Sequence, residues 1–177
     1  MRKVVVYQLL SLDGVAESPD RFFGWDDALD ANLDAVIATQ DAVLLGRRSY
    51  DEWAGYWPDS DIEPFASFVN GVPKYVATST PLDRTWDRSQ VVDGDLITFV
   101  RDLKARPGGD VGVHGSISVA RSLLAGGGGD ELRLVVAPAV AGSGSRLLDG
   151  LPPLGLEVIR SSTSPTGHLL VDYRVLG

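Results

Sequence analysis

The chain has 177 residues, 44% of them hydrophobic and 23% charged, a composition typical of one globular domain with a substantial core. Its formal net charge of -8 argues against a surface for nucleic acid or anionic membranes, so any site for an anion has to be local. Cysteine is absent, which excludes disulfides, thiolate metal ligands and cysteine nucleophiles.

The first residues, MRKVVVYQLLSLDG, place two basic residues before an apolar run and so superficially resemble a signal peptide. Gln8 interrupts the run, and Asp13 and Gly14 end it without a small-residue cleavage site. We therefore interpret residues 4–10 as a first strand buried on both faces. No stretch is long enough to span a bilayer, and we expect a cytoplasmic protein without a membrane partner.

A loop over residues 11–19 separates this strand from an amphipathic helix that begins at Asp26. The apolar residues of the helix recur at helical spacing: Leu29, Leu33, Val36 and Ile37. Residues 42–45 predict a short buried strand that breaks at Gly46, and residues 48–53 predict a second helix.

The middle of the chain alternates loops, short strands and one amphipathic helix. The expected elements are a loop over residues 57–64, a strand over 74–77, a turn over 78–81 and a brief strand at Val91 and Val92. The helix carries Leu96, Val100 and Leu103 on one face. It is capped near Asp93 or Asp95 and ends at Pro107.

Residues 110–138, DVGVHGSISVARSLLAGGGGDELRLVVAP, predict a strand, a glycine turn, a helix and a second strand. The first strand breaks at His114 and Gly115, after which the side chain of Ser116 is expected to cap the helix. Four consecutive glycines end the helix, and the second strand ends at Pro138. Such a turn presents free N–H groups and the positive end of a helix dipole, where a phosphate can bind. The alternative is an ordinary crossover in which the glycine serves only the turn.

The chain closes with a glycine-rich loop and two strands, residues 154–160 and 169–175, that form an antiparallel hairpin. Alternating strands and helices closed by a hairpin predict the α/β class. We expect one domain over residues 1–177, with helices on both faces of a mostly parallel sheet.

Common fingerprints of catalytic sites are missing. No G-x-G-x-x-G, Walker A, H-E-x-x-H or EF-hand pattern occurs, and the two histidines lie in no cluster with metal-ligand spacing, so no metal site is expected. His114-Gly115-Ser116 lacks the final glycine of the serine-hydrolase elbow, because Ile117 and Ser118 follow.

The strongest local signal is LGRRSY at residues 45–50, where a buried strand ends. Two guanidiniums and a hydroxyl beside helix N–H groups suit phosphate oxygens, which arginine binds in a planar and often bidentate way. The alternative is a solvated pair of arginines bound to Asp51 or Glu52.

The motifs SLDG (11–14), LLGRRSYDEW (44–53), VHGS (113–116) and DELRLVVAPAVAGSGSRLL (130–148) occur in this order over nearly the whole chain. With them the sequence resembles the dihydrofolate-reductase-like superfamily. The closer resemblance is to its riboflavin-biosynthesis branch, the reductase half of the bifunctional deaminase-reductases and their stand-alone bacterial relatives. The resemblance implies a three-layer α/β/α fold, a reductase that uses NADPH, and a homodimer that pairs through the glycine-rich loop and the closing strands.

The resemblance also implies a set of cofactor-binding residues. They are Gly46, Arg47, Arg48 and Ser49 facing the adenosine phosphates, Thr78 and Ser79 after their strand, and His114, Gly115, Ser116 and Ile117 cradling the pyrophosphate. Many relatives have glycine in place of His114 and arginine in place of Ser79. The ribose phosphate of NADPH would then rely on Arg47 or Arg48.

A carboxylate that helps to protonate the substrate falls near Asp30 by the same resemblance, with Asp27 a turn away. Each could instead be a solvated helix carboxylate. The Trp-x-Leu-Pro segment of folate-reducing relatives is missing, so folate is not the expected substrate. The expected activity is hydride transfer from NADPH to a C=N or C=O group of a small heterocycle, pteridine-like or ribitylaminopyrimidine-like. The alternative is a pyridine-nucleotide or pterin-binding protein without turnover.

Overall fold

The computed structural model describes residues 1–177 and contains one eight-stranded sheet with the strand order β4-β3-β2-β5-β1-β6-β8-β7. The strands are β1 (Val4–Leu10), β2 (Gln40–Gly46), β3 (Lys74–Ala77), β4 (Ser89–Val91), β5 (Asp110–His114), β6 (Glu131–Val136), β7 (Gly155–Thr163) and β8 (Leu169–Leu176). The first six run parallel, and β8 pairs antiparallel with β6 and β7.

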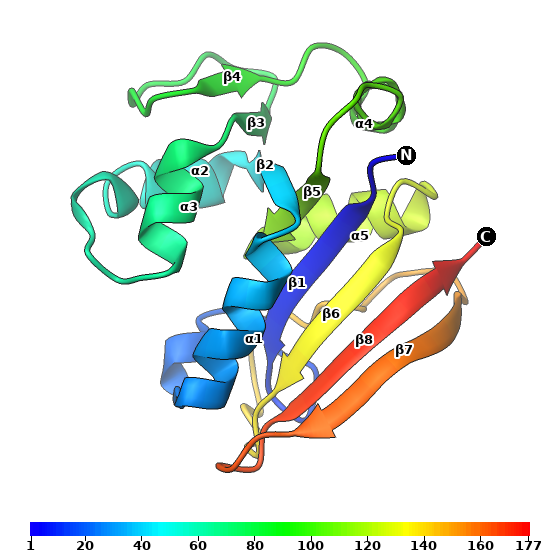
Figure 1. Ribbon diagram of the computed structural model, residues 1–177. Coiled ribbons are helices and arrows are strands. Elements are labelled where there is room, and N and C mark those ends of the chain that lie inside the picture. The colour runs from blue at the N-terminus through cyan, green and yellow to red at the C-terminus, as the bar shows by residue number, and fades with distance from the viewer.

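Helices cover both faces of this sheet (Figure 1). They are α1 (Asp27–Ile37), α2 (Arg47–Trp53), α3 (Phe65–Gly71), α4 (Leu96–Lys104) and α5 (Ile117–Ala125), with short 3-10 helices η1 (Pro19–Arg21) and η2 (Trp57–Asp59). One buried cluster joins α1, α2 and α3 to one face of the sheet, and a second joins α4 and α5 to the other face. The predicted α/β class and three layers are confirmed. None of the helices is long and apolar enough to cross a membrane.

Local rules explain most element boundaries. The Asp26 side chain accepts a hydrogen bond from the Leu29 N–H at 2.9 Å and begins α1, and Asp95 caps α4 in the same way through Thr98. Strands β1 and β3 have the predicted bounds. Strand β2 begins two residues before the predicted start.

Strand β7 extends three residues beyond its predicted end at residue 160. Two larger differences from the sequence analysis concern α3 and the start of α5. Helix α3 was not predicted, because its seven residues are too few to show a helical period against the loop before it. The predicted cap of α5 is wrong: the Ser116 side chain does not bond to its own helix, and its Oγ accepts a hydrogen bond from the Gly46 N–H at 2.9 Å. The hydroxyl therefore ties the end of β5 to the end of β2.

Strand β5 ends earlier than its neighbour β1, and this opens the carboxyl edge of the sheet. The last residue of β1 that pairs with β5 is Tyr7, opposite His114, whereas β1 continues to Leu10 with β6 as its partner on the other side. The last three residues of β1 therefore have no strand beside them on the β5 side. Helix α5 begins at this place.

Candidate functional site

A cavity of about 910 Å³ lies at this carboxyl edge. Its walls come from β1, the loop after β1, α1, α2, the segment from Tyr56 to Phe65, and the β5–α5 turn. Of the predicted site residues, those that line it are Asp30, Gly46, Arg48, Ser49, His114, Gly115, Ser116 and Ile117. The others, Asp27, Arg47, Thr78 and Ser79, do not line it.

Gly115 makes the sharp turn from β5 into α5. Its φ is +75°, a left-handed conformation that favours glycine, and a Cβ there would lie 2.9 Å from Cζ2 of Trp53. No side chain caps α5, so the N–H groups of its first turn are free to bind a ligand at the cavity. The nine-residue helix adds the positive end of its dipole. This turn can hold a negatively charged group.

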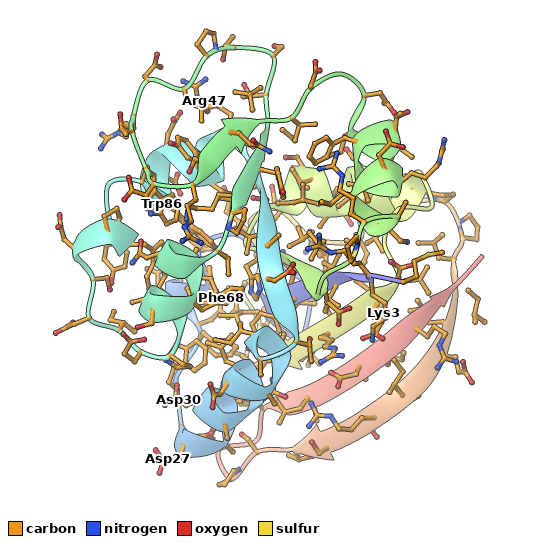
Figure 2. The ribbon with its side chains drawn as sticks, turned by 45° about the horizontal axis from the view of Figure 1, so that its top comes forward. Lys3, Asp27, Asp30, Arg47, Phe68 and Trp86 are labelled. Atoms are coloured by element: carbon orange, nitrogen blue, oxygen red, sulfur yellow. The ribbon has the colours of Figure 1, made fainter.

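The two adjacent arginines at the start of α2 have different surroundings. Arg48 lines the cavity with its side chain 81% exposed, and its guanidinium lies 3.1 Å from Glu52 and 4.0 Å from Glu17. Arg47 points to the loop after β3, at the end of the sheet remote from α1 (Figure 2).

Arg47 is almost fully engaged by the protein itself. Its Nε binds Asp51 at 2.9 Å, one Nη binds Asp83 at 2.6 Å, and the other donates to the Thr80 Oγ1 and the Pro81 carbonyl. The Asp51 carboxylate, and after it Asp83, raise the pKa of Arg47. In this structure Arg47 fastens the 80–83 loop to α2.

Thr78 and Ser79 line a second, smaller cavity of about 440 Å³ between β3, β4 and the start of α4. Its other lining residues are Ala77, Val91, Val92, Gly94 and Leu96. The predicted cofactor residues therefore line two cavities at the same edge of the sheet, except Arg47, which lines neither.

The imidazole of His114 is part of the core. It is 3% exposed, its Nε2 lies 2.8 Å from Oε1 of Gln40, and its ring packs against Tyr7, Phe65 and Phe68. Burial lowers the pKa of His114 to about 3, so the ring is neutral near pH 7. Gly112 makes the Gln40 bond possible, because a Cβ there would lie 2.0 Å from the Gln40 oxygen.

The two predicted carboxylates of α1 differ in position. Asp30 lines the cavity, and its carboxylate makes no hydrogen bond or ion pair with the protein. Asp27 lies at the outer end of α1, beyond the cavity wall (Figure 2). Only Asp30 is placed to reach a molecule in the cavity.

Tyr7 and Gln8 are lining residues that the sequence analysis missed. They are 5% and 3% exposed, and the Tyr7 hydroxyl and the Gln8 Nε2 are buried without a hydrogen-bond partner in the protein. Burial raises the pKa of Tyr7, so its hydroxyl keeps its proton over the physiological range. The one signal in the sequence was a glutamine within an apolar strand.

An aromatic wall completes the cavity, and it too was missed. Trp53, Trp57 and Phe65 meet edge to face, with ring centroids 4.8–6.0 Å apart. Trp25 and Tyr56 also line the cavity and are about half exposed. Planar rings stack well on such surfaces.

The SLDG motif holds the glycine-rich loop beside the cavity. The Asp13 carboxylate accepts hydrogen bonds from the N–H groups of Ala141 and Gly142, each at 2.9 Å, and from the Ser11 hydroxyl at 2.6 Å. These bonds hold the pKa of Asp13 well below its usual range. Ser145 of the same loop lines the cavity and donates its N–H to Glu17.

Comparisons with known proteins identify relatives of this chain. The profile of the family described as RibD C-terminal domain matches residues 2–170. The protein YyaP of Bacillus subtilis (strain 168) is 27% identical over 180 residues, which cover 97% of this chain and 94% of that protein.

Solved structures share the fold. A structure described as a riboflavin biosynthesis protein from Shewanella sp. PV-4 matches with a TM-score of 0.79 at 19% identity, over 99% of both chains. Dihydrofolate reductase from Enterococcus faecalis, complexed with NADP(H), matches with a TM-score of 0.66 at 13% identity, over 99% of this chain and 97% of that one. The predicted dihydrofolate-reductase-like fold is confirmed.

A bifunctional enzyme from Thermotoga maritima also matches, with a TM-score of 0.71 at 16% identity. It is described as a diaminohydroxyphosphoribosylaminopyrimidine deaminase and 5-amino-6-(5-phosphoribosylamino)uracil reductase. The match covers 99% of this chain and 57% of that chain, so this chain spans little more than half of the bifunctional protein.

Proposed function

The chain belongs to the RibD C-terminal domain family, and from this premise we propose that it is an NADPH-dependent reductase of a small heterocycle, pteridine-like or ribitylaminopyrimidine-like. The observation that carries the proposal is the uncapped N-terminus of α5 behind Gly115, which opens onto an aromatic cavity with unpartnered polar groups. An anion site and a site for a planar ring thus adjoin each other, as hydride transfer between two bound molecules requires.

The residues present fit a dinucleotide cofactor. The free N–H groups of Ile117 and its neighbours, with the Ser49 hydroxyl nearby, suit a pyrophosphate. Thr78 and Ser79, in the second cavity, would hold the adenosine end. When bound, the cofactor supplies a hydride, which with one proton reduces C=N to CH–NH, or C=O to CH–OH, and leaves the oxidised nicotinamide.

The chain's own part is to orient the substrate ring and to handle the proton. The aromatic wall excludes water from one side of the cavity, and the protonated Tyr7 hydroxyl can donate a hydrogen bond to the substrate. Asp30 can accept an N–H of the ring or pass a proton to it.

The test is oxidation of NADPH by the purified protein with a panel of pteridine, ribitylaminopyrimidine and quinone acceptors. The expected result is loss of reduced-nicotinamide absorbance with one class of acceptor. NADPH binding without oxidation by any acceptor would instead support the alternative, a nucleotide-binding or pterin-binding protein without turnover.

Asp30→Asn and Asp27→Asn form a matched pair for the proton step. Both remove one carboxylate from α1, but only Asp30 lines the cavity. Asp30→Asn is expected to lower kcat by about 10²-fold, the usual scale for loss of general acid–base catalysis, while Asp27→Asn leaves it near wild type. Equal activities of the two variants would remove Asp30 from the mechanism.

We also propose that the protein is a homodimer that pairs through β7 and the glycine-rich loop. All nine residues of β7 are exposed, among them Leu156, Val158 and Ile159, and β7 is an edge strand. An exposed apolar edge strand is a ready surface for pairing with a second chain.

A further inference from the structure

The charged side chains that line the main cavity are mostly acidic. Five carboxylates line it, and the only cations are Arg48 and Arg121. The carboxylates are Glu17, Asp20, Asp30, Glu52 and Glu63.

Neither arginine is available on the aromatic side of the cavity. Arg48 belongs to the first turn of α2 and pairs with Glu52. Arg121 belongs to α5, and its guanidinium donates to the carbonyls of Leu147, at 3.1 Å, and Arg146. Both cations therefore lie on the two helices that begin at the carboxyl edge, where the cofactor phosphates are proposed to bind.

The aromatic side combines stacking surfaces with hydrogen-bond acceptors and one free donor. Glu63 and Asp30 lie on this side with Trp57 and Phe65, and no lysine or arginine accompanies them. The Tyr7 hydroxyl is a buried donor without a hydrogen-bond partner in the protein, and Tyr7 belongs to the same buried cluster as Phe65. Gln8 follows it on β1 and points to the other face of the sheet. Unsatisfied buried donors favour a ligand that brings acceptors such as ring nitrogens or carbonyl oxygens.

A phosphate group on the substrate would find no partner there. A phosphomonoester carries about 1.5 to 2 negative charges near pH 7 and is normally recognised by arginine, lysine or a helix N-terminus. On the aromatic side it would meet carboxylates instead, and like charges at close range repel.

We propose that the substrate is an uncharged or cationic, unphosphorylated planar heterocycle that stacks on the aromatic wall and accepts a hydrogen bond from Tyr7. This inference rests on the proposed reductase function and narrows it. It separates this chain from the Thermotoga maritima relative, whose description names a phosphoribosylamino substrate.

The experiment is a fluorescence titration, since Trp25, Trp53 and Trp57 line the cavity and report on its occupant. The probes are a ribitylaminouracil, its 5′-phosphate and a neutral pterin, each added to the cofactor-free protein. The unphosphorylated ribitylaminouracil or the pterin is expected to bind at least about tenfold tighter than the phosphorylated compound. Equal or tighter binding of the phosphate ester overturns the proposal, and so does failure of all three to bind.

A matched pair of charge variants tests the electrostatic cause. Asp20 lines the cavity and Asp59 does not, both are exposed, and neither makes an ion pair or a side-chain hydrogen bond. Asp20→Arg is expected to raise the affinity for the phosphate ester about tenfold. Asp59→Arg is expected to leave the ratio of the affinities for the ribitylaminouracil and its 5′-phosphate unchanged. Equal ratios in the two variants would overturn the role of the carboxylates.

NADPH oxidation by the same three compounds separates the two proposals. If the compounds bind with the expected preference but none of them oxidises NADPH, the reductase proposal is refuted and the proposal of an unphosphorylated ligand is supported. Oxidation that favours the phosphate ester supports the reductase and overturns the ligand class.

Discussion

At the scale of single residues, Gly115 serves both the turn from β5 into α5 and the proposed cofactor site. Both depend on the absence of a Cβ at this position. Its φ of +75° means that any Cβ adds strain, and this Cβ would also press on the indole of Trp53. A substitution therefore acts on the turn and on the aromatic wall together.

Gly115→Ala is expected to cost about 1–2 kcal/mol of stability from backbone strain, and Gly115→Val more, because its branched side chain meets Trp53. Both are expected to weaken NADPH binding, since the pyrophosphate has to approach this backbone closely. Thermal midpoint and NADPH affinity, measured on the same variants, check this. Normal affinity in folded Gly115→Val would remove the cofactor from this turn.

Arg47 and Arg48 are the residues that we propose set the preference for NADPH over NADH. The family resemblance implies that one of them binds the ribose phosphate, and in the structure Arg47 already holds Asp51 and Asp83. If Arg47 takes the phosphate, it has to exchange Asp83, which is exposed.

Replacing both arginines by alanine is expected to weaken NADPH binding by about 1.5–3 kcal/mol per charged hydrogen bond lost, and NADH binding much less. Asp83→Ala should have the opposite effect on NADPH, because it frees part of the Arg47 guanidinium. Titration of both cofactors against each variant measures this, with exposed Arg101→Ala as the control. An equal loss for the two cofactors would exclude a role for these arginines in the preference.

At the scale of elements, the end of β5 is held by a neutral histidine in the core. The pKa of His114 is lowered by burial from 6.5 to about 3, so between these pH values the unfolded chain binds a proton that the folded chain does not. The contribution of His114 to stability is therefore lost as the pH falls through this window.

His114→Gln removes that titration, and its amide can still donate to Gln40. The free energy of unfolding of the wild type is expected to fall more steeply between pH 6.5 and 5 than that of the variant, by up to about 1.4 kcal/mol per pH unit. Urea unfolding at several pH values measures both slopes. Parallel slopes would show that burial does not lower the pKa of His114.

At the scale of the whole molecule, the two edges of the sheet differ. Strand β4 is only three residues long, whereas β7 is a nine-residue edge with exposed apolar side chains. Long unpaired edges usually need a partner or a protective charge, and the exposed Leu156, Val158 and Ile159 give β7 an apolar surface.

Light scattering at micromolar concentration is expected to give twice the chain mass of 18.9 kDa. Ile159→Lys should restore the monomer mass, because a lysine would be buried without a partner in a β7 interface. Val91→Lys, on the opposite edge strand, should leave the dimer intact. A wild-type mass of 18.9 kDa would contradict the dimer.

The sequence by itself determined the order of the elements, the α/β class and the family resemblance. Local signals were enough for these: the β-branched run of β1, the apolar spacing of α1, an aspartate cap for α4, and glycines at Gly46 and Gly115 where strands end. Each of these signals acts over a few neighbouring residues, so it can be read without knowing the partners.

Only the tertiary structure decided what each candidate side chain faces. Arg47 and Arg48 are adjacent, but successive residues of a helix point about 100° apart, so one bonds the 80–83 loop and the other lines the cavity. Tyr7 and Gln8 became candidates only because β5 ends beside them, and the imidazole of His114 faces Gln40, 74 positions earlier. Contacts between residues far apart in the chain set these environments, and no pattern along the chain encodes them locally.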